Sequence, residues 1–159
     1  MGMVEKDYEE FLRLLNKHKV KYCIVGAYAL AFYATPRYTK DMDVFMEQSR
    51  DNARKVIKVL HEFGFADLKL TEEDLMEPKA IIQLGYEPLR IDLVTSIDGC
   101  SFERTWKNRT KGKYGHENIF FIGFKELIRN KRASNRKKDL ADLEMLKKYT
   151  AKPKKRSRT

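Results

Sequence analysis

One stretch decides the fold of this chain: VGAYALAFYATPRYTKDMDVFM, residues 25–46. It begins at the end of a short apolar run, Tyr22–Val25, which predicts a buried strand. Gly26 follows that strand and precedes a helix-forming segment, AYALAFYA, at residues 27–34. Because glycine has no Cβ and a helix N-terminus offers unpaired N–H groups, such a turn can accept a phosphate. The other interpretation is a turn glycine without any ligand.

Two carboxylates lie near the end of the same stretch. Asp41 and Asp43 flank Met42 and lead into a second expected strand, residues 43–47. In an extended segment, residues two apart point to the same side, so both carboxylates would converge. Close carboxylates repel each other and are costly to bury, and a hard divalent cation such as Mg²⁺ or Mn²⁺ resolves both problems. A solvated surface turn is the alternative.

A third carboxylate, Asp92, lies within the apolar run LRIDLV at residues 89–94. If this strand lies beside that of Asp43, its carboxylate completes a cluster of three acids. Alternatively, Asp92 lies on the exposed face of an edge strand, which it would share with Arg90 because the two residues are two apart.

The composition is that of a polar, basic protein with enough apolar residues for a core. The chain has 159 residues, of which 42% are hydrophobic and 35% charged, and its net charge is +10. The basic excess favours phosphate-rich partners such as nucleotides or RNA. No stretch approaches the ~18 apolar residues of a membrane helix. The N-terminus, MGMVEKDYEE, carries acids where a signal peptide is basic, so we expect a cytoplasmic protein without a membrane partner. Cys23 and Cys100 form no zinc-binding pattern.

Hydrophobic periodicity predicts an α/β (α+β) domain with a mixed central sheet flanked by helices, among them C-terminal helices. Asp51 is the expected cap of the third helix, and Gly64 its stop. We expect a single domain over residues 1–150 and a basic, disordered tail over 151–159. The expected helices are 4–18, 27–34, 52–63, 102–108, 124–132 and 137–149, and the expected strands are 22–25, 43–47, 66–70, 81–84, 89–94 and 118–122.

Taken together, the glycine turn, the D-h-D strand and the distant h-D-h strand resemble the nucleotidyltransferases of the DNA polymerase β-like superfamily. The small AbiEii-type toxin nucleotidyltransferases are the most similar, with a segment like G-G-x-A-L-x-x-x-G-x-x-R-x-T-x-D-h-D. The chain departs from that pattern at Ala27, where relatives carry glycine or serine, and at Ala34, where they carry glycine. A second similarity lies in ELIRNKRASNRKKDLADLEML, residues 126–146, which is similar to the family's L-I-x-x-K-x-x-x-x-R-x-x-D-x-x-D-h-x-x-L.

The resemblance implies a nucleotidyltransferase fold and assigns roles to individual residues. Asp41 and Asp43 would hold both metal ions, and Asp92 would bind the catalytic one. The implied contacts with the nucleotide come from Gly26, Ala27, Arg37, Thr39, Lys40, Lys131 and Arg136. Asp139 and Asp142 would orient the last two through ion pairs, although helix residues at this spacing also form plain surface pairs.

Three functions remain open from the sequence. The leading one is transfer of a nucleoside monophosphate from an NTP to a hydroxyl of tRNA, a protein or a small molecule, with a toxin and its antitoxin partner as one setting. The second is a catalytically silent nucleic-acid-binding module. For this, RNA contacts would come from the tail and from segments 104–113 and 125–138, which hold five and seven basic residues. A metal-dependent phosphodiesterase is the third. Tyr28, Phe32 and Tyr33 are expected in the core rather than against a base.

Overall fold

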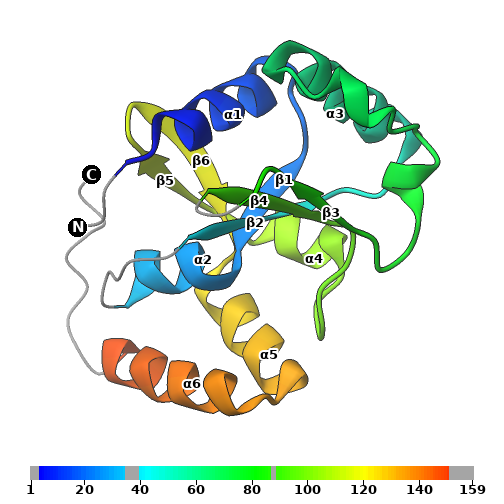
Figure 1. Cartoon of the computed structure of the whole chain (residues 1–159). Helices are drawn as coiled ribbons and strands as arrows, with labels where there is room; N and C mark the ends of the chain where they lie inside the picture. The colour runs from blue at the N-terminus through cyan, green and yellow to red at the C-terminus, as the bar shows by residue number, and fades with distance from the viewer. Residues whose placement is uncertain (1–3, 35–39, 87–88, 151–159) are drawn as a thin grey trace.

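The computed structural model describes residues 4–34, 40–86 and 89–150, in which one six-stranded mixed sheet carries helices on both faces (Figure 1). The predicted fold class is confirmed, whereas the predicted tail, 151–159, lies outside the described residues. The strands are β1 (Tyr22–Val25), β2 (Asp41–Met46), β3 (Ile81–Leu84), β4 (Arg90–Val94), β5 (Thr110–Tyr114) and β6 (Glu117–Phe121). The α-helices are α1 (Lys6–Lys17), α2 (Gly26–Tyr33), α3 (Arg50–Phe63), α4 (Phe102–Lys107), α5 (Phe124–Ser134) and α6 (Lys137–Thr150).

The strand order is β3-β4-β2-β1-β6-β5, so the two strands that carry the acids are direct neighbours at the centre of the sheet. β2 runs antiparallel to β1 and parallel to β4. β3 and β4 form the expected antiparallel hairpin. The end of β1 therefore lies at the same edge of the sheet as the beginnings of β2 and β4.

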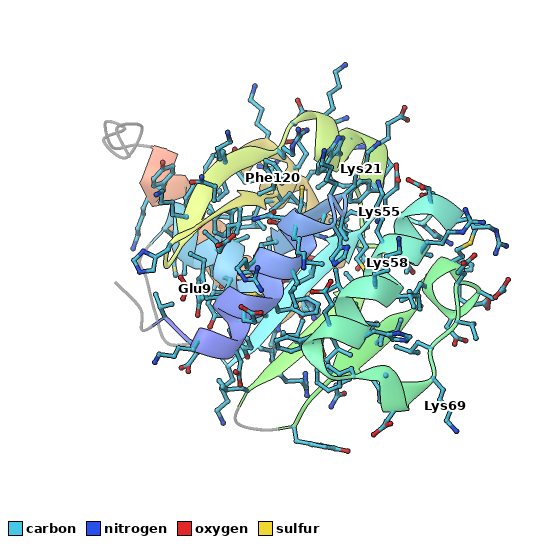
Figure 2. The ribbon with its side chains drawn as sticks, turned by 90° about the horizontal axis from the view of Figure 1, so that it is seen from above. Glu9, Lys21, Lys55, Lys58, Lys69 and Phe120 are labelled. Atoms are coloured by element: carbon cyan, nitrogen blue, oxygen red, sulfur yellow. The ribbon has the colours of Figure 1, made fainter. Side chains whose placement is uncertain are left out.

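The helices divide between the two faces of the sheet. In Figure 1, α1 and α3 lie on one face, and α2, α5 and α6 lie on the other. Figure 2, seen from above, shows α1 and α3 in front of the sheet, with Lys55 and Lys58 labelled on the outer side of α3. The inner side of α1 is apolar, with buried residues Tyr8, Phe11, Leu12, Leu14 and Leu15. Burial of side chains of this size stabilises the fold by about 1.5–3 kcal/mol each.

The third helix begins two residues earlier than expected. Ser49, rather than Asp51, is the N-cap, and its hydroxyl accepts a hydrogen bond from the Asn52 N–H at 3.2 Å. Asp51 instead lies in the first turn, where a negative charge favours the helix dipole. Gly64 ends the helix in the left-handed region at φ +100°, as predicted.

Asn52 ties this helix to the sheet. Its side-chain oxygen accepts from the Lys21 N–H at 2.8 Å, and its amide donates to the carbonyls of Lys21 and Glu47 at 3.1 and 3.0 Å. The residue is 1% exposed, so these three bonds replace water for a fully buried amide.

One strand prediction was wrong, and one strand was not predicted. Residues 66–70 form no strand, because Ala66–Leu68 is a 3₁₀ turn that ends at Lys69 in the left-handed region. The sequence also gave no sign of β5. That edge strand carries exposed Lys111 and Lys113, so it lacks an apolar alternation, and lysines of this kind protect a sheet edge from pairing with other chains.

Two further expectations have a plain outcome. Tyr33 is buried, while Tyr28 and Phe32 are half-buried and pack on the core, so the aromatic set belongs to the core as predicted. Over residues 4–34, 40–86 and 89–150, no helix has the length and apolar character needed to cross a membrane.

We expect Asn52→Ala to lower the free energy of unfolding by about 2–4 kcal/mol, because it strands backbone groups of Lys21 and Glu47. Urea titration followed by circular dichroism measures the change. Asn118→Ala, at an exposed position, is the matched control and should change stability by less than about 0.5 kcal/mol. Equal effects of the two substitutions would show that the Asn52 bonds do not anchor the helix.

Candidate active site

The three predicted acids lie together across two adjacent strands. Asp43 of β2 is the register partner of Asp92 of β4, and Asp41 is the register partner of Arg90. Because side chains two residues apart on a strand share a face, all four side chains project from the same face of the sheet. Asp92 is buried at 9% exposure, and Asp41 and Asp43 are half-buried. The register therefore places the three acids on one face of the sheet, as the sequence suggested.

Arg90 bridges two of these acids. Its guanidinium donates to Asp92 Oδ1 and Oδ2 at 3.1 Å each, and to Asp41 Oδ2 at 2.8 Å. The other oxygen of Asp41, Oδ1, is buried and has no hydrogen-bond partner among the described residues. A buried carboxylate oxygen without a donor is costly, and a cation or a water molecule is the usual remedy.

Tyr8 of α1 forms hydrogen bonds with the backbone at the beginnings of both strands. Its hydroxyl donates toward the carbonyl oxygens of Lys40 and Arg90, the latter at 2.9 Å, and accepts from the Arg90 N–H at 2.9 Å. Burial raises the pKa of this phenol to about 12, so the hydroxyl keeps its proton. A single side chain thus fixes the backbone just before the acids on both strands.

Gly26 makes room for Asp43. It begins α2 directly after Val25, which is the register partner of Asp43, and its φ is +71°. A Cβ at this position would lie 2.2 Å from Asp43 Oδ2, which is far inside contact distance. The glycine is therefore required twice, by its left-handed backbone and by the carboxylate packed against it.

The environment of Asp43 disfavours its negative charge. Burial, followed by the charges of Asp92 and Asp41, raises the pKa of this carboxyl from 3.8 to about 6. The positive charges of Lys138 and Arg90 act in the opposite direction but only in part. Three acids with incomplete compensation form a site that would gain from an additional cation.

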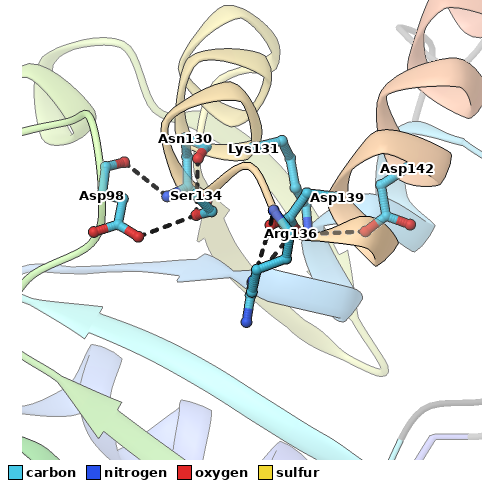
Figure 3. Close-up of polar contacts among 7 residues, drawn as sticks. All are labelled: Asp98, Asn130, Lys131, Ser134, Arg136, Asp139 and Asp142. Carbon is cyan, nitrogen blue, oxygen red and sulfur yellow. Dashed lines mark hydrogen bonds and ion pairs between the residues drawn. The ribbon is translucent and has the colours of Figure 1, made fainter.

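A second polar cluster joins α5 to α6 (Figure 3). The Lys131 ammonium lies 3.4 Å from Asp139 Oδ1 and 2.9 Å from Asp142 Oδ2, and all three side chains are buried. Asp139 Oδ2 also accepts from the backbone N–H and Nε of Arg136 at 3.0 and 2.9 Å. Asn135, at φ +52°, makes the turn between the helices.

This cluster bears on two of the predicted phosphate contacts. Figure 3 shows Arg136 projecting from the α5–α6 turn, away from both helices, and its side chain is 60% exposed. Lys131 is 6% exposed and engaged by two carboxylates, which is the arrangement of a residue that anchors the turn. Its role as a phosphate ligand stays a prediction.

Lys138, in the first turn of α6, was missed by the sequence reasoning. It is exposed, and its charge is the largest of those that lower the pKa of Asp43. The signal was present as the third basic residue of RKK, but the family pattern gave no reason to choose it.

The remaining predicted site residues have mixed outcomes. Ala27 follows Gly26 in the first turn of α2 and is half-buried, and Lys40 is exposed beside Asp41. Arg37 and Thr39 lie in 35–39, outside the described residues. In the basic segment 104–113, the guanidinium of Arg109 stacks 3.6 Å from the centre of the Trp106 ring, so that ring already has a partner.

The carboxylate oxygens at this site suit a magnesium or manganese ion in their chemistry, although they do not form a complete coordination shell. Carboxylate oxygens are the ligands that these hard cations prefer, and Asp41 Oδ1 and the charge-strained Asp43 offer them. Over residues 4–34, 40–86 and 89–150, however, no three ligands are grouped closely enough to hold a metal. The Arg90 guanidinium instead bonds both oxygens of Asp92 and one of those of Asp41.

A mixed sheet with acids on adjacent strands beside a strand–glycine–helix turn is the architecture of a nucleotidyltransferase. The chain belongs to the family described as "Nucleotidyl transferase of unknown function (DUF2204)", whose model matches residues 4–157. This confirms that the protein is a nucleotidyltransferase, as the sequence resemblance predicted. No curated protein matches the sequence.

Two solved structures share the fold. One is the lincosamide antibiotic adenylyltransferase LnuA with lincomycin bound, at 16% identity and a TM-score of 0.57, with 94% of this chain and 99% of that chain covered. The other is a protein from Thermotoga maritima classed as a nucleotidyltransferase, at 13% identity and a TM-score of 0.54, with 94% and 96% covered.

Gly26→Ala and Gly64→Ala form a matched pair of substitutions. Both place a Cβ on a glycine with positive φ, which costs about 1–2 kcal/mol, but only the first meets a carboxylate. We expect Gly26→Ala to reduce thermal stability more and to reduce nucleotidyl transfer sharply, whereas Gly64→Ala retains full transfer. Retained transfer in Gly26→Ala would contradict the close packing of Gly26 on Asp43.

Asp43→Asn should stabilise the chelator-treated protein in a pH-dependent way. Because the pKa of Asp43 is about 6 in the folded protein and 3.8 ordinarily, ionising it costs stability as the pH rises through this window. Above pH 6 the substitution should therefore add about 2–3 kcal/mol, and below pH 4 almost nothing. Urea unfolding in EDTA at several pH values measures this, with exposed Asp67→Asn as control. A gain in stability that is independent of pH would contradict the raised pKa of Asp43.

Proposed function

We propose that this nucleotidyltransferase is metal-dependent and transfers a nucleoside monophosphate from an NTP to an acceptor hydroxyl, with release of pyrophosphate. The observation that carries the proposal is the register of β2 and β4, which brings Asp41, Asp43 and Asp92 to one face beside Gly26. The family match supports the reaction class, and the unpartnered Asp41 Oδ1 supports a cation at the acids.

Asp41, Asp43 and Asp92 would hold Mg²⁺ or Mn²⁺. A divalent ion bound there lowers the pKa of an attacking hydroxyl and offsets the negative charge of the phosphates. We assign to Asp92, in register with Asp43 on the neighbouring strand, the role of accepting the proton of the hydroxyl.

The triphosphate has a matching set of groups in the chain. Gly26 and the N–H of Ala27 lie at the N-terminus of α2, where N–H groups and the helix dipole favour anions. Lys40, Arg136 and Lys138 are exposed and basic on the segments before β2 and at the start of α6. We assign these three to the phosphate oxygens, together with Arg37 and Thr39 from the segment outside the described residues.

The acceptor is a hydroxyl of tRNA, a protein or a small molecule. The similarity in fold to an adenylyltransferase with a bound lincosamide favours adding small molecules to the acceptors that are tested. A toxin of a toxin–antitoxin pair remains one biological setting for the same chemistry.

A catalytically silent nucleic-acid-binding module is the second candidate. Two observations favour it: Ala27 replaces the glycine or serine of relatives, and Arg90 already forms hydrogen bonds with two of the acids. It predicts RNA binding that weakens with salt and does not require Mg²⁺.

The direct test is incubation with each labelled NTP, Mg²⁺ and either total RNA, a protein lysate or a panel of hydroxyl-bearing small molecules. We expect one acceptor to gain label, and Asp43→Ala to abolish the labelling by a factor of at least about 100 while the protein remains folded. Exposed Asp67→Ala should label as the wild type does. Undiminished labelling by Asp43→Ala would refute the three-acid mechanism, and salt-sensitive RNA binding without labelling would support the silent module.

A further inference from the structure

We infer that Arg90 is a positioning residue that occupies the place of the cation in the nucleotide-free enzyme. The triphosphate must bind the Arg90 guanidinium, and so draw it away from the acids, before the acids bind a metal ion. Metal and nucleotide would then enter together rather than separately. The inference deepens the proposed function and rests on it in one respect, that Asp41 and Asp92 are metal ligands.

The first argument is geometric. The guanidinium donates three charge-assisted hydrogen bonds to two acids on different strands, and it contacts both oxygens of Asp92. An ion that needs those oxygens must displace the arginine. Arginine is suited to this place because its planar fork presents several donors to two carboxylates at once.

The second argument concerns what holds the arginine. Its backbone N–H donates to Tyr8, and its carbonyl oxygen accepts from the same hydroxyl, so the main chain of Arg90 is fixed at the start of β4. The side chain, by contrast, is 26% exposed, and its strand neighbour Asp41 is 34% exposed. The guanidinium therefore has a solvent-facing direction in which to rotate while the backbone stays in place.

The third argument is charge balance. With Arg90 in place, the three acids and one guanidinium sum to −2, and a bare divalent ion must compete with a bonded cation. Once a triphosphate is bound, Arg90 gains an alternative anion of higher charge, so its release from the acids costs less. Metal and nucleotide binding are then coupled favourably, as linkage requires of two ligands that select the same state.

The experiment measures binding rather than turnover. Mn²⁺ affinity is determined by electron paramagnetic resonance or calorimetry for the wild type and Arg90→Gln, with and without a non-hydrolysable NTP analogue. We expect Arg90→Gln to bind Mn²⁺ alone about tenfold more tightly, the ratio that corresponds to about 1.4 kcal/mol. We also expect the analogue to improve Mn²⁺ affinity strongly in the wild type and far less in the variant.

The matched control is Arg50→Gln. Arg50 also bridges two carboxylates, Glu72 and Glu73, at 2.8 and 3.1 Å, but on the surface of α3. It should leave Mn²⁺ binding unchanged. If Arg90→Gln does not fold, Arg90→Lys replaces it, because a single ammonium cannot engage both acids equally and should give an affinity between those of the wild type and Arg90→Gln.

The outcomes separate the two proposals. Mn²⁺ affinity that is unchanged or weaker in the Arg90 variant, with Mn²⁺ binding intact in the wild type, would overturn this inference and leave the proposed function standing. Absence of Mn²⁺ binding in every protein, even with the NTP analogue, would refute the metal site and this inference together.

Discussion

Repulsion between carboxylates on neighbouring parallel strands is the constraint on which the site depends. The register that pairs Asp43 with Asp92 places like charges directly beside each other on adjacent strands, which are about 4.8 Å apart. Such an arrangement lowers stability unless positive charge is brought to it. Arg90 supplies part of that charge, and in our proposal a cation that arrives with the substrate supplies more.

The rest of the scaffold holds this strained arrangement in place. Tyr8 fixes the main chain at the start of β2 and β4, and Gly26 admits the Asp43 carboxylate against the first turn of α2. Elsewhere in the fold, the buried Lys131–Asp139–Asp142 cluster fixes the α5–α6 turn, from which Arg136 and Lys138 extend. A buried ion-pair cluster adds little net stability, but it can specify a single geometry, and here that geometry serves the acids.

Much of this could be predicted because the relevant signals are local. The apolar run before Gly26, the i,i+2 spacing of Asp41 and Asp43, and the lone acid in an apolar strand are each visible within a few adjacent residues. The central sheet and its acids followed from them. The Asp51 cap was wrong because Ser49, two residues earlier, is an equally good N-cap residue and begins the helix there.

The unpredicted features depend on contacts between distant parts of the chain. Arg90 was interpreted as a possible partner on an exposed edge, but its role depends on the register of β4 against β2. The effect of Lys138 on the pKa of Asp43 depends on where α6 lies relative to Asp43, which the sequence alone does not show. The edge strand β5 was missed because exposed edges are chosen for charge rather than apolar alternation.

The most direct measurement of the central claim is a crystal structure with Mn²⁺ and a non-hydrolysable NTP, with the manganese located by its anomalous scattering. The account predicts anomalous density between Asp41, Asp43 and Asp92, with the triphosphate along the first turn of α2 and the Arg90 guanidinium turned from the acids to a phosphate. Manganese bound elsewhere, with Arg90 still bridging Asp41 and Asp92, would contradict it.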